Sequence, residues 1–270
     1  MNYFKEFKIN DHIYQFKDPL GVLCTLVIGK KQALLIDTTY GIGNLPKLIA
    51  QYTTLPLIVI DSHGHMDHSC GNYQFSAVYL QAHDLELCKL HNSYQRRLNN
   101  IEDALRMKVL PEDFDKALYL SQTEGNLLLF EENLTFDLGG LHVQTINMEG
   151  HTAGSVGILI EEDHILVVTD ATCPFVWLFL EESLPLHIYV AMLERTLTLP
   201  FNHILLGHGA GALLPKAKVI DFYNTAKSID LNEAVPVKFN HFENANAYCY
   251  TKGKMYDQND VGIVFDPHKL

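Results

Sequence analysis

Ser62-His63-Gly64-His65-Met66-Asp67-His68 carries the densest set of metal-binding side chains in this 270-residue chain. It follows Leu57-Ile58-Val59-Ile60, an apolar run whose length and β-branched content predict a buried strand. Imidazole nitrogen and carboxylate oxygen are ligands that suit zinc, iron or manganese. If the segment stays extended, His63 and His65 share one face, because side chains alternate along a strand, and Asp67 and His68 point elsewhere. The motif therefore predicts two metal positions rather than one.

The composition narrows the class of protein. Hydrophobic residues make up 47% of the chain and the formal net charge is −12, which predicts a globular protein and disfavours nucleic-acid partners. Residues 1–10 lack the apolar core of a secretory leader, and no run reaches the ~18–20 apolar residues of a membrane span. Five cysteines without a close pair argue against a disulfide framework. We expect a single domain over residues 1–270, cytoplasmic, with a small-molecule substrate and no membrane partner.

Apolar runs separated by turn residues predict a protein rich in strands. Strands are expected at 12–16, 22–28, 33–36, 57–60, 77–80, 126–138, 141–146, 156–160, 165–168, 203–208, 247–250 and 261–265. Helices are expected at 43–52, 186–199 and 216–231. Between 83 and 120, apolar residues recur at helical spacing, which predicts a helical insertion that could form a lid. In it, His83 and His91 are expected to be surface or packing residues rather than ligands.

Four further His and Asp residues lie where predicted strands end. Asp37 either caps the next element or accepts the N–H of a ligating histidine and so orients it. His151 lies at a bend between glycines, and Asp170 follows a strand. His208 has a glycine on each side, which permits close approach that a side chain would block. Each residue alone would be structural. As an ordered series with the first motif, they indicate a site.

This series resembles the metallo-β-lactamase-fold hydrolase superfamily, in particular its glyoxalase II-like and lactonase-like branch. The resemblance spans about residues 12 to 210. It consists of His63-x-His65-x-Asp67-His68, Gly150-His151-Thr152-x-Gly154-Ser155, Asp170 and Gly207-His208-Gly209, with Asp37 at an earlier strand end. It implies an α+β fold, a four-layer αββα sandwich in which two mixed sheets lie face to face with helices outside.

The resemblance also implies a dinuclear site at one edge of the sandwich. By position, the first metal would be bound by His63, His65 and His151, and the second by Asp67, His68 and His208, with Asp170 and a hydroxide bridging them. We expect two divalent ions, zinc in the first place, with iron or manganese as alternatives. Coordination lowers the pKa of water from about 15.7 to about 7, which supplies a hydroxide nucleophile. Asp67 is expected to hold or receive a proton as well, the alternative being metal binding alone.

Other residues favour or disfavour particular branches of the superfamily. His65 stands where flavodiiron members carry glutamate, and Asp170 stands where typical zinc β-lactamases carry a ligating cysteine. Phe175, Trp177 and Phe179 either line an apolar acyl-binding pocket or belong to the core. The basic C-terminal segment typical of true glyoxalase II is not seen, which disfavours glutathione thioesters.

The sequence therefore predicts a metallo-hydrolase of a small ester, lactone or thioester. Two alternatives stay open at this point: a small-molecule phosphodiesterase that uses the same dinuclear site, and a catalytically silent metal-binding protein. A homodimer is an expectation from the family alone.

Overall fold

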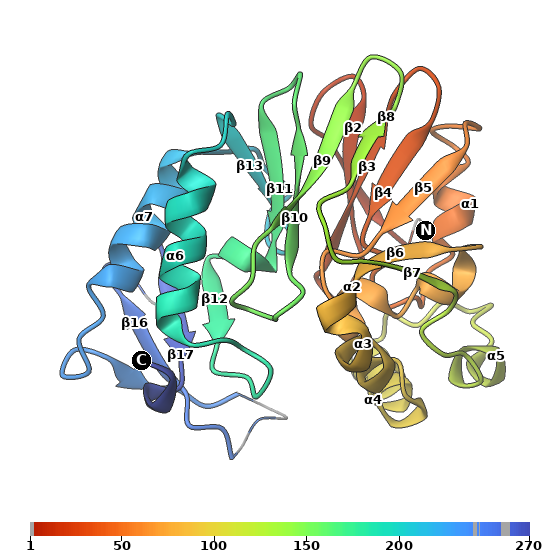
Figure 1. The fold of residues 1–270 in the computed structure, drawn as a ribbon. Coiled ribbons are helices and arrows are strands. Elements are labelled where there is room, and N and C mark those ends of the chain that lie inside the picture. Colours follow the sequence, from red (N-terminus) through yellow and green to blue (C-terminus); the bar gives the residue numbers. More distant parts are fainter. Residues whose placement is uncertain (1–2, 240–241, 243, 255–259) are drawn as a thin grey trace.

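Two mixed sheets face each other at the centre of the molecule (Figure 1). The computed structural model describes residues 3–239, 242, 244–254 and 260–270. The first sheet contains, in spatial order, β1 (Lys5–Lys8), β2 (Ile13–Lys17), β3 (Leu23–Ile28), β4 (Ala33–Ile36), β5 (Leu57–Ile60), β6 (Val78–Gln81) and β7 (Leu127–Phe130). Neighbouring strands are antiparallel from β1 to β4 and parallel from β4 to β7.

The second half of the chain forms two sheets. The larger contains, in spatial order, β14 (Leu214–Pro215), β13 (His203–Leu206), β11 (Ile165–Thr169), β10 (Val156–Ile160), β9 (His142–Asn147) and β8 (Thr135–Asp137). In it, β11 and β13 are parallel and the other neighbours are antiparallel. The smaller contains β12 (Phe175–Leu178), β17 (Gly262–Phe265), β16 (Tyr248–Thr251) and β15 (Val235–Pro236).

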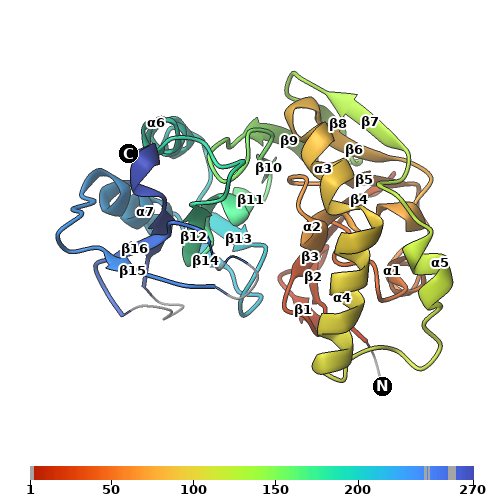
Figure 2. The same cartoon turned by 90° about the horizontal axis from the view of Figure 1, so that it is seen from below.

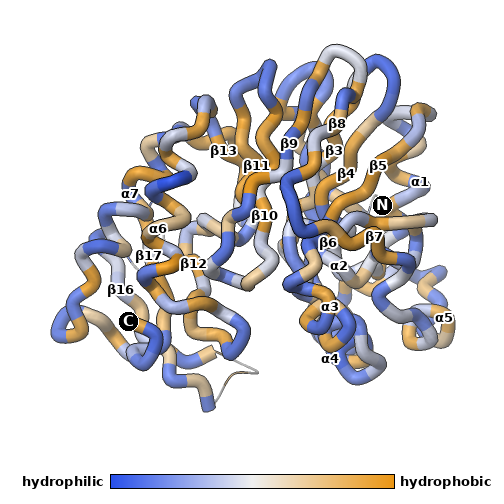
Figure 3. The backbone as a smooth tube through the Cα atoms, in the orientation of Figure 1, coloured by the Kyte–Doolittle hydropathy of each residue, from blue (hydrophilic) through white to orange (hydrophobic). Residues whose placement is uncertain are grey.

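Apolar side chains from both large sheets fill the space between them. Ile36 and Ile60 of the first sheet belong to the same buried cluster as Ile158 and Val167 of the second. Each such side chain contributes about 1.5–3 kcal/mol when it is fully buried. Figure 3 shows the hydrophobic residues concentrated in the strands and the hydrophilic ones in the loops. The continuous apolar runs of the sequence are thus the strands that lie between two packed layers.

Helices cover the outer faces of the two large sheets. Helix α1 (Leu45–Ile49) packs on the first sheet through a cluster that includes Leu35 and Leu45. Helices α6 (Leu186–Leu197) and α7 (Ala217–Lys227) pack on the second through Met192 and Phe222. The layer order is therefore helix, sheet, sheet, helix, which confirms the expected αββα sandwich of the α+β class. The third sheet is an addition that the sequence did not predict.

A helical insertion lies between β6 and β7, as expected for residues 83–120. It contains η2 (Ala82–Asp84), α3 (Leu85–His91), α4 (Tyr94–Arg106) and α5 (Lys116–Leu120). Figure 2 shows α4 running along the N-terminal half. Arg97 of α4 is fully buried and donates hydrogen bonds to oxygen atoms of Cys70, Asn92 and Thr123. These bonds fasten the insertion to the loop that follows the first histidine motif.

The parallel strand pairs bring the chemically important strand ends to one edge. Because β4 and β5 are parallel, Asp37 and His63 follow adjacent strand ends. The same holds for Asp170 and His208 after β11 and β13. His65 is still extended, with φ −69° and ψ 151°, and helix α2 (Met66–Ser69) begins directly after it. The remaining short helices are η1 (Asn72–Gln74), η3 (Asp170–Thr172) and η4 (Pro267–Lys269). Throughout the described ranges, no helix is long and apolar enough to cross a membrane.

Candidate metal centre

Three buried imidazoles converge at the first position predicted for a metal. His63 Nε2 and His151 Nε2 each lie 3.0 Å from His65 Nδ1. All three side chains are buried, and their nitrogen atoms lie within 4.8 Å of one another. His63 comes from the loop after β5 and His151 from the loop between β9 and β10, so the two large sheets both contribute. The three nitrogen atoms are close enough to coordinate one ion.

The outer hydrogen bonds of these rings fix where their protons lie. His65 Nε2 lies 2.7 Å from Glu182 Oε1, and His151 Nδ1 lies 2.7 Å from the carbonyl oxygen of Trp177. Since both partners are acceptors, these two nitrogens carry the protons. His65 Nδ1 and His151 Nε2 therefore face each other as lone pairs across 3.0 Å. Two lone pairs at this distance repel each other, and a bound cation would remove the repulsion, since neutral imidazole nitrogen is a zinc ligand.

A second group adjoins the first. Asp67, His68, Asp170 and His208 place one ligand atom each within 4.8 Å of the others. His208 Nε2 lies 3.2 Å from Asp67 Oδ2 and 3.3 Å from Asp170 Oδ2. His68 Nε2 is buried without a hydrogen-bond partner and lies 3.5 Å from Asp67 Oδ2 and from Asp170 Oδ1. A buried nitrogen without a hydrogen bond, next to two carboxylates, fits a position that binds a cation.

Asp37 lies behind His68. Its Oδ2 accepts a hydrogen bond from His68 Nδ1 at 2.7 Å, and its two oxygens also accept from the backbone N–H and the hydroxyl of Ser62. All three residues are fully buried. The contact keeps a proton on His68 Nδ1, so Nε2 is the ring nitrogen that faces the second group. This is the geometry of the orienting role expected for Asp37, rather than of a helix cap.

The two groups differ electrostatically. Burial and the neighbouring His65 ring lower the pKa of His151 to about 4, and burial together with the adjacent imidazoles holds the pKa of His63 well below its usual value. Burial opposes protonation of His208 and His68 too, but the surrounding carboxylates outweigh it. They raise the pKa of His208 to about 10 and that of His68 well above its ordinary range. His63 and His151 of the first group thus offer neutral nitrogens, whereas the second group attracts positive charge.

Close backbone approaches explain two of the motif glycines. A Cβ atom on Gly207 would lie 2.7 Å from Asp170 Oδ1 and 2.9 Å from His68 Cε1. A Cβ atom on Gly154 would lie 2.7 Å from the carboxylate of Asp84. Asp84 is buried and accepts hydrogen bonds from the N–H groups of Gly64 and Gly154 and from the hydroxyl of Thr152. It therefore joins the two loops that carry the first group, a role that no motif in the sequence indicated.

Glu182 and His91 both contact the His65 ring. The His91 ring is stacked on His65, with centroids 4.8 Å apart and an interplanar angle of 25°. Glu182 follows β12, and its bond to His65 holds the Glu182 pKa at about 2 even though burial acts in the opposite direction. Glu182 gave no sequence signal, because it lies 117 positions from its partner. His91 packs as expected, but on a candidate ligand.

The aromatic residues Phe175, Trp177 and Phe179 pack in one cluster. Phe179 is 5% exposed and stacks on Phe239 at 5.2 Å, while Phe175 and Trp177 are half-buried. Trp177 also contacts Phe242. The cluster joins the site through the backbone, because the Trp177 carbonyl holds His151.

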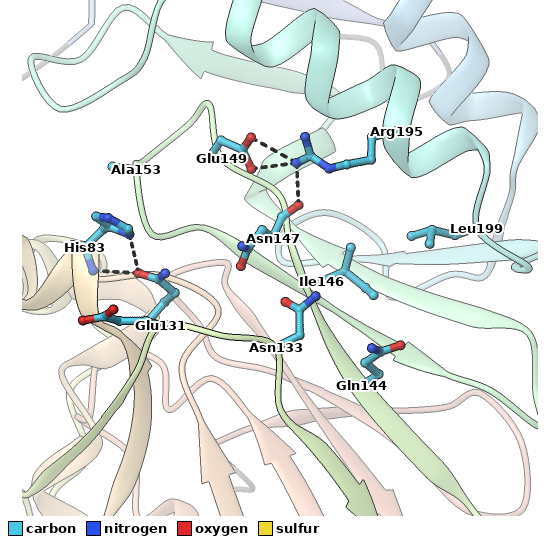
Figure 4. A pocket seen from close by; sticks show the side chains of 11 residues that line it. His83, Glu131, Asn133, Gln144, Ile146, Asn147, Glu149, Ala153, Arg195 and Leu199 are labelled. Carbon is cyan, nitrogen blue, oxygen red and sulfur yellow. Dashed lines mark hydrogen bonds and ion pairs between the residues drawn. The ribbon is translucent and has the colours of Figure 1, made fainter.

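A cavity of about 600 Å³ lies away from both groups (Figure 4). Its lining includes Glu131, Asn133 and Ala153, and an ion pair between Arg195 and Glu149, with Arg195 Nη2 lying 2.8 Å from Glu149 Oε2, borders it. Ala153 belongs to the loop that carries His151, so the cavity borders that loop. None of the seven candidate ligands lines it.

Comparison with known proteins agrees with this architecture. The family model of the metallo-β-lactamase superfamily matches residues 18–208, which include both groups. The chain therefore belongs to the metallo-β-lactamase superfamily. Membership of the superfamily does not by itself assign the branch to which the chain belongs.

The curated relatives are distant. The acyl-coenzyme A thioesterase MBLAC2 of Homo sapiens is 24% identical over 157 residues, which cover 54% of this chain and 56% of the relative. The Bos taurus protein of the same name matches equally. The chain thus spans about half the length of these relatives.

Solved structures share the fold. A metallo-β-lactamase from Pontibacter korlensis has a TM-score of 0.57 at 16% identity, covering 84% of this chain and 100% of that one. The sec-alkylsulfatase Pisa1 from Pseudomonas sp. has a TM-score of 0.61 at 14% identity, covering 83% of this chain and 42% of that one. At these identities the likeness shows the fold alone.

Proposed function

We propose that this protein is a metal-dependent hydrolase, a single domain that holds two divalent ions, zinc foremost, and cleaves a small acyl substrate. The observation that carries the proposal is the pair of adjoining ligand groups: three converging imidazoles, of which His65 and His151 direct lone pairs at each other, and two carboxylates with two imidazoles beside them. His63, His65 and His151 would hold the first ion. The second group, Asp67, His68, Asp170 and His208, would hold the other, with Asp170 shared.

When bound, such ions lower the pKa of coordinated water and polarise an acyl oxygen. The protein's own residues supply the rest. Glu182, Trp177 and Asp37 orient the imidazoles through their outer nitrogens. Asp67, whose Oδ2 lies 3.2 Å from His208 Nε2, accepts a proton as water adds to the acyl carbon and returns it to the leaving group. The products are a carboxylic acid and a thiol or alcohol.

A thioester is the leading candidate among the acyl substrates. The curated relatives are named as acyl-coenzyme A thioesterases, and their matched segments support thioester chemistry here. The half-buried ring of Trp177 beside the His151 loop supports an apolar acyl group as the part recognised. Lactones and esters remain within the proposal, since they require the same attack on an acyl carbon.

Hydrolysis by zinc-loaded protein tests the proposal on four substrates: a short acyl thioester, a lactone, a carboxylic ester and a bis-aryl phosphodiester. The His68→Ala variant excludes contaminating activity, and His83→Ala, outside both ligand groups, is the matched control. We expect acyl turnover that His83→Ala keeps and His68→Ala loses. Phosphodiester turnover without acyl turnover overturns the proposed substrate class. If the protein binds metal but turns over none of the four substrates, the proposal that it is a hydrolase is overturned.

A further inference from the structure

We propose that His91 supplies the hydrogen-bond donor that holds the acyl oxygen of the substrate beside the first imidazole group. This inference rests on the proposed function, because it assigns a residue that recognises the substrate of that site. His91 is the last residue of α3, in the helical insertion, and it lies outside the seven candidate ligands.

The place of the ring is well defined. It stacks on His65 with centroids 4.8 Å apart, and one of its nitrogens lies within 4.8 Å of a ligand atom on each of His65 and Glu182. The side chain is 9% exposed, so little freedom is left to it. His91 therefore lies at the edge of the first imidazole group, where a substrate bound there would meet it.

The contact with Met66 fixes the tautomer. The backbone N–H of Met66 donates a hydrogen bond to His91 Nδ1 at 3.2 Å, so Nδ1 is an acceptor without a proton of its own. The proton of the ring then lies on Nε2. Within the described part of the chain, Nε2 has no hydrogen-bond partner, yet it is not among the buried polar atoms without one. Nε2–H is thus a donor without an acceptor among the described residues.

The same protons argue against a third metal at this point, although His65, His91 and Glu182 are close enough for one. His65 Nε2 donates to Glu182, and His91 Nδ1 is occupied by Met66. Neither ring has a free lone pair for an ion beside Glu182. What the arrangement offers is one unused N–H.

A neutral N–H of fixed direction suits an oxygen acceptor. The oxygen of an acyl group gains negative charge as water adds to its carbon, and a donor already in place stabilises that charge without rearrangement. The same donor binds the carboxylate of the acid product. Hydrogen bonds to charged oxygen contribute about 1.5–3 kcal/mol, which corresponds to about a tenfold or greater change in affinity.

Product binding tests the assignment without relying on turnover. Butyrate is titrated into zinc-loaded protein by calorimetry, with zinc content and zinc affinity measured on the same samples. In His91→Asn, the side-chain oxygen can replace Nδ1 as acceptor for Met66, but no donor reaches the position of Nε2. His91→Gln places an amide N–H near that position. His83→Asn is the control, since His83 lies at the Figure 4 cavity.

We expect His91→Asn to weaken butyrate binding about tenfold or more at unchanged zinc affinity, and His91→Gln to restore part of it. Unchanged butyrate binding in His91→Asn overturns the proposal. So does a loss of zinc affinity that accounts for the weaker binding, because His91 would then only support His65. If the binding of inorganic phosphate depends on His91 and the binding of butyrate does not, the assignment of His91 to an acyl oxygen is overturned. If butyrate binding depends on His91 but the unaltered protein shows no acyl turnover, the role of His91 as a donor is supported and the proposed hydrolase function is refuted.

Discussion

Glu182 Oε1 lies 2.7 Å from His65 Nε2, so a residue after β12 holds an imidazole from the loop after β5. The Glu182 turn is itself held from the C-terminal end of the chain. Lys269 Nζ donates hydrogen bonds to the carbonyl oxygens of Leu180, Glu181 and Ser183. The two halves of the sandwich thus meet at His65, a candidate ligand, and its orientation depends on both.

Replacing Glu182 should weaken metal binding at the first group. Glu182→Leu removes the acceptor for His65 Nε2–H, so the ring loses the bond that directs its Nδ1 lone pair inward. We expect zinc affinity to fall about 10–100-fold. Glu182→Gln keeps an acceptor oxygen and should lose less. Competition with a chromophoric chelator measures both variants, and equal affinities for Glu182→Leu and the unaltered protein would refute the role.

Replacing Asp37 should weaken metal binding at the second group instead. Asn tolerates the positive φ of 68° at this position, so Asp37→Asn preserves the backbone. Its amide N–H₂ would face His68 Nδ1–H, and two donors cannot pair. The ring would shift its proton to Nε2, the atom that faces Asp67 and Asp170. We expect one tightly bound zinc per chain in place of two, measured by elemental analysis after dialysis. Two retained ions would contradict this account.

The sequence could predict the candidate ligands because their positions follow from local pattern. β4 and β5 are continuous apolar runs, and a polar residue at the end of such a run lies at a sheet edge whatever the rest of the chain does. Glu182, His91 and Asp84 have no comparable signal, since their contacts depend on how the insertion and the third sheet pack against the first motif. Long-range packing of this kind leaves no periodicity in the sequence.

The same distinction between local pattern and long-range packing explains which parts of the fold the sequence predicted. The buried strands of the two large sheets were predicted to within a residue or two, but the single strand expected at 126–138 is two strands, β7 and β8, in different sheets. β1 was missed because Lys5–Lys8 is mostly exposed and polar, and β14 and β15 were missed because each has two residues. The third sheet depends on parallel pairing of β12 with β17, where Phe175 pairs with Gly262. The sequence did not predict β12 as a strand, and apolar runs do not show which strands are neighbours.

Asp84 should contribute to stability more than an exposed aspartate. It is buried and accepts from Gly64, Gly154 and Thr152, so Asp84→Asn sets an amide N–H₂ against backbone N–H groups. We expect the free energy of unfolding to fall by about 2–3 kcal/mol. Asp113→Asn, at an exposed position, should change it by less than about 0.5 kcal/mol. Urea denaturation of the metal-free proteins measures both, and similar values for the two would exclude the bridging role.

Metal-free protein should be most stable near pH 6.5. His151 and His91 have folded-state pKa values of about 4 and 3, below the ordinary 6.5, because burial disfavours their charged forms. The unfolded chain then binds more protons, and stability falls as pH drops from 6.5 towards these values. His68 and His208 have raised pKa values, so the folded state keeps their protons longer. Their contribution is present below pH 6.5 and is lost as pH rises towards 10, the His208 value.

Urea midpoints of metal-free protein between pH 4 and 10 test this optimum. His208→Gln removes one group with a raised pKa. The urea midpoint of this variant should therefore fall less steeply above pH 6.5 and keep its dependence on pH below 6.5. His151→Gln should flatten the acidic side. A midpoint that rises steadily through pH 8 in the unaltered protein would contradict the assignment of opposite shifts to the two groups.

Asp67 should be needed for turnover beyond its contact with an ion. Its Oδ2 lies 3.2 Å from His208 Nε2 and 3.5 Å from His68 Nε2, so its carboxylate is directed into the second group. Asp67→Asn keeps one oxygen as a ligand but cannot take up a proton from water or deliver it to a leaving group. We expect kcat to fall about 10²–10⁴-fold with KM nearly unchanged, in protein that is reloaded to the zinc content of the unaltered enzyme. A leaving group of low pKa needs no proton, so an activated aryl thioester should recover part of the lost rate and an alkyl thioester should not. Equal losses on both thioesters would mean that Asp67 acts only through metal binding.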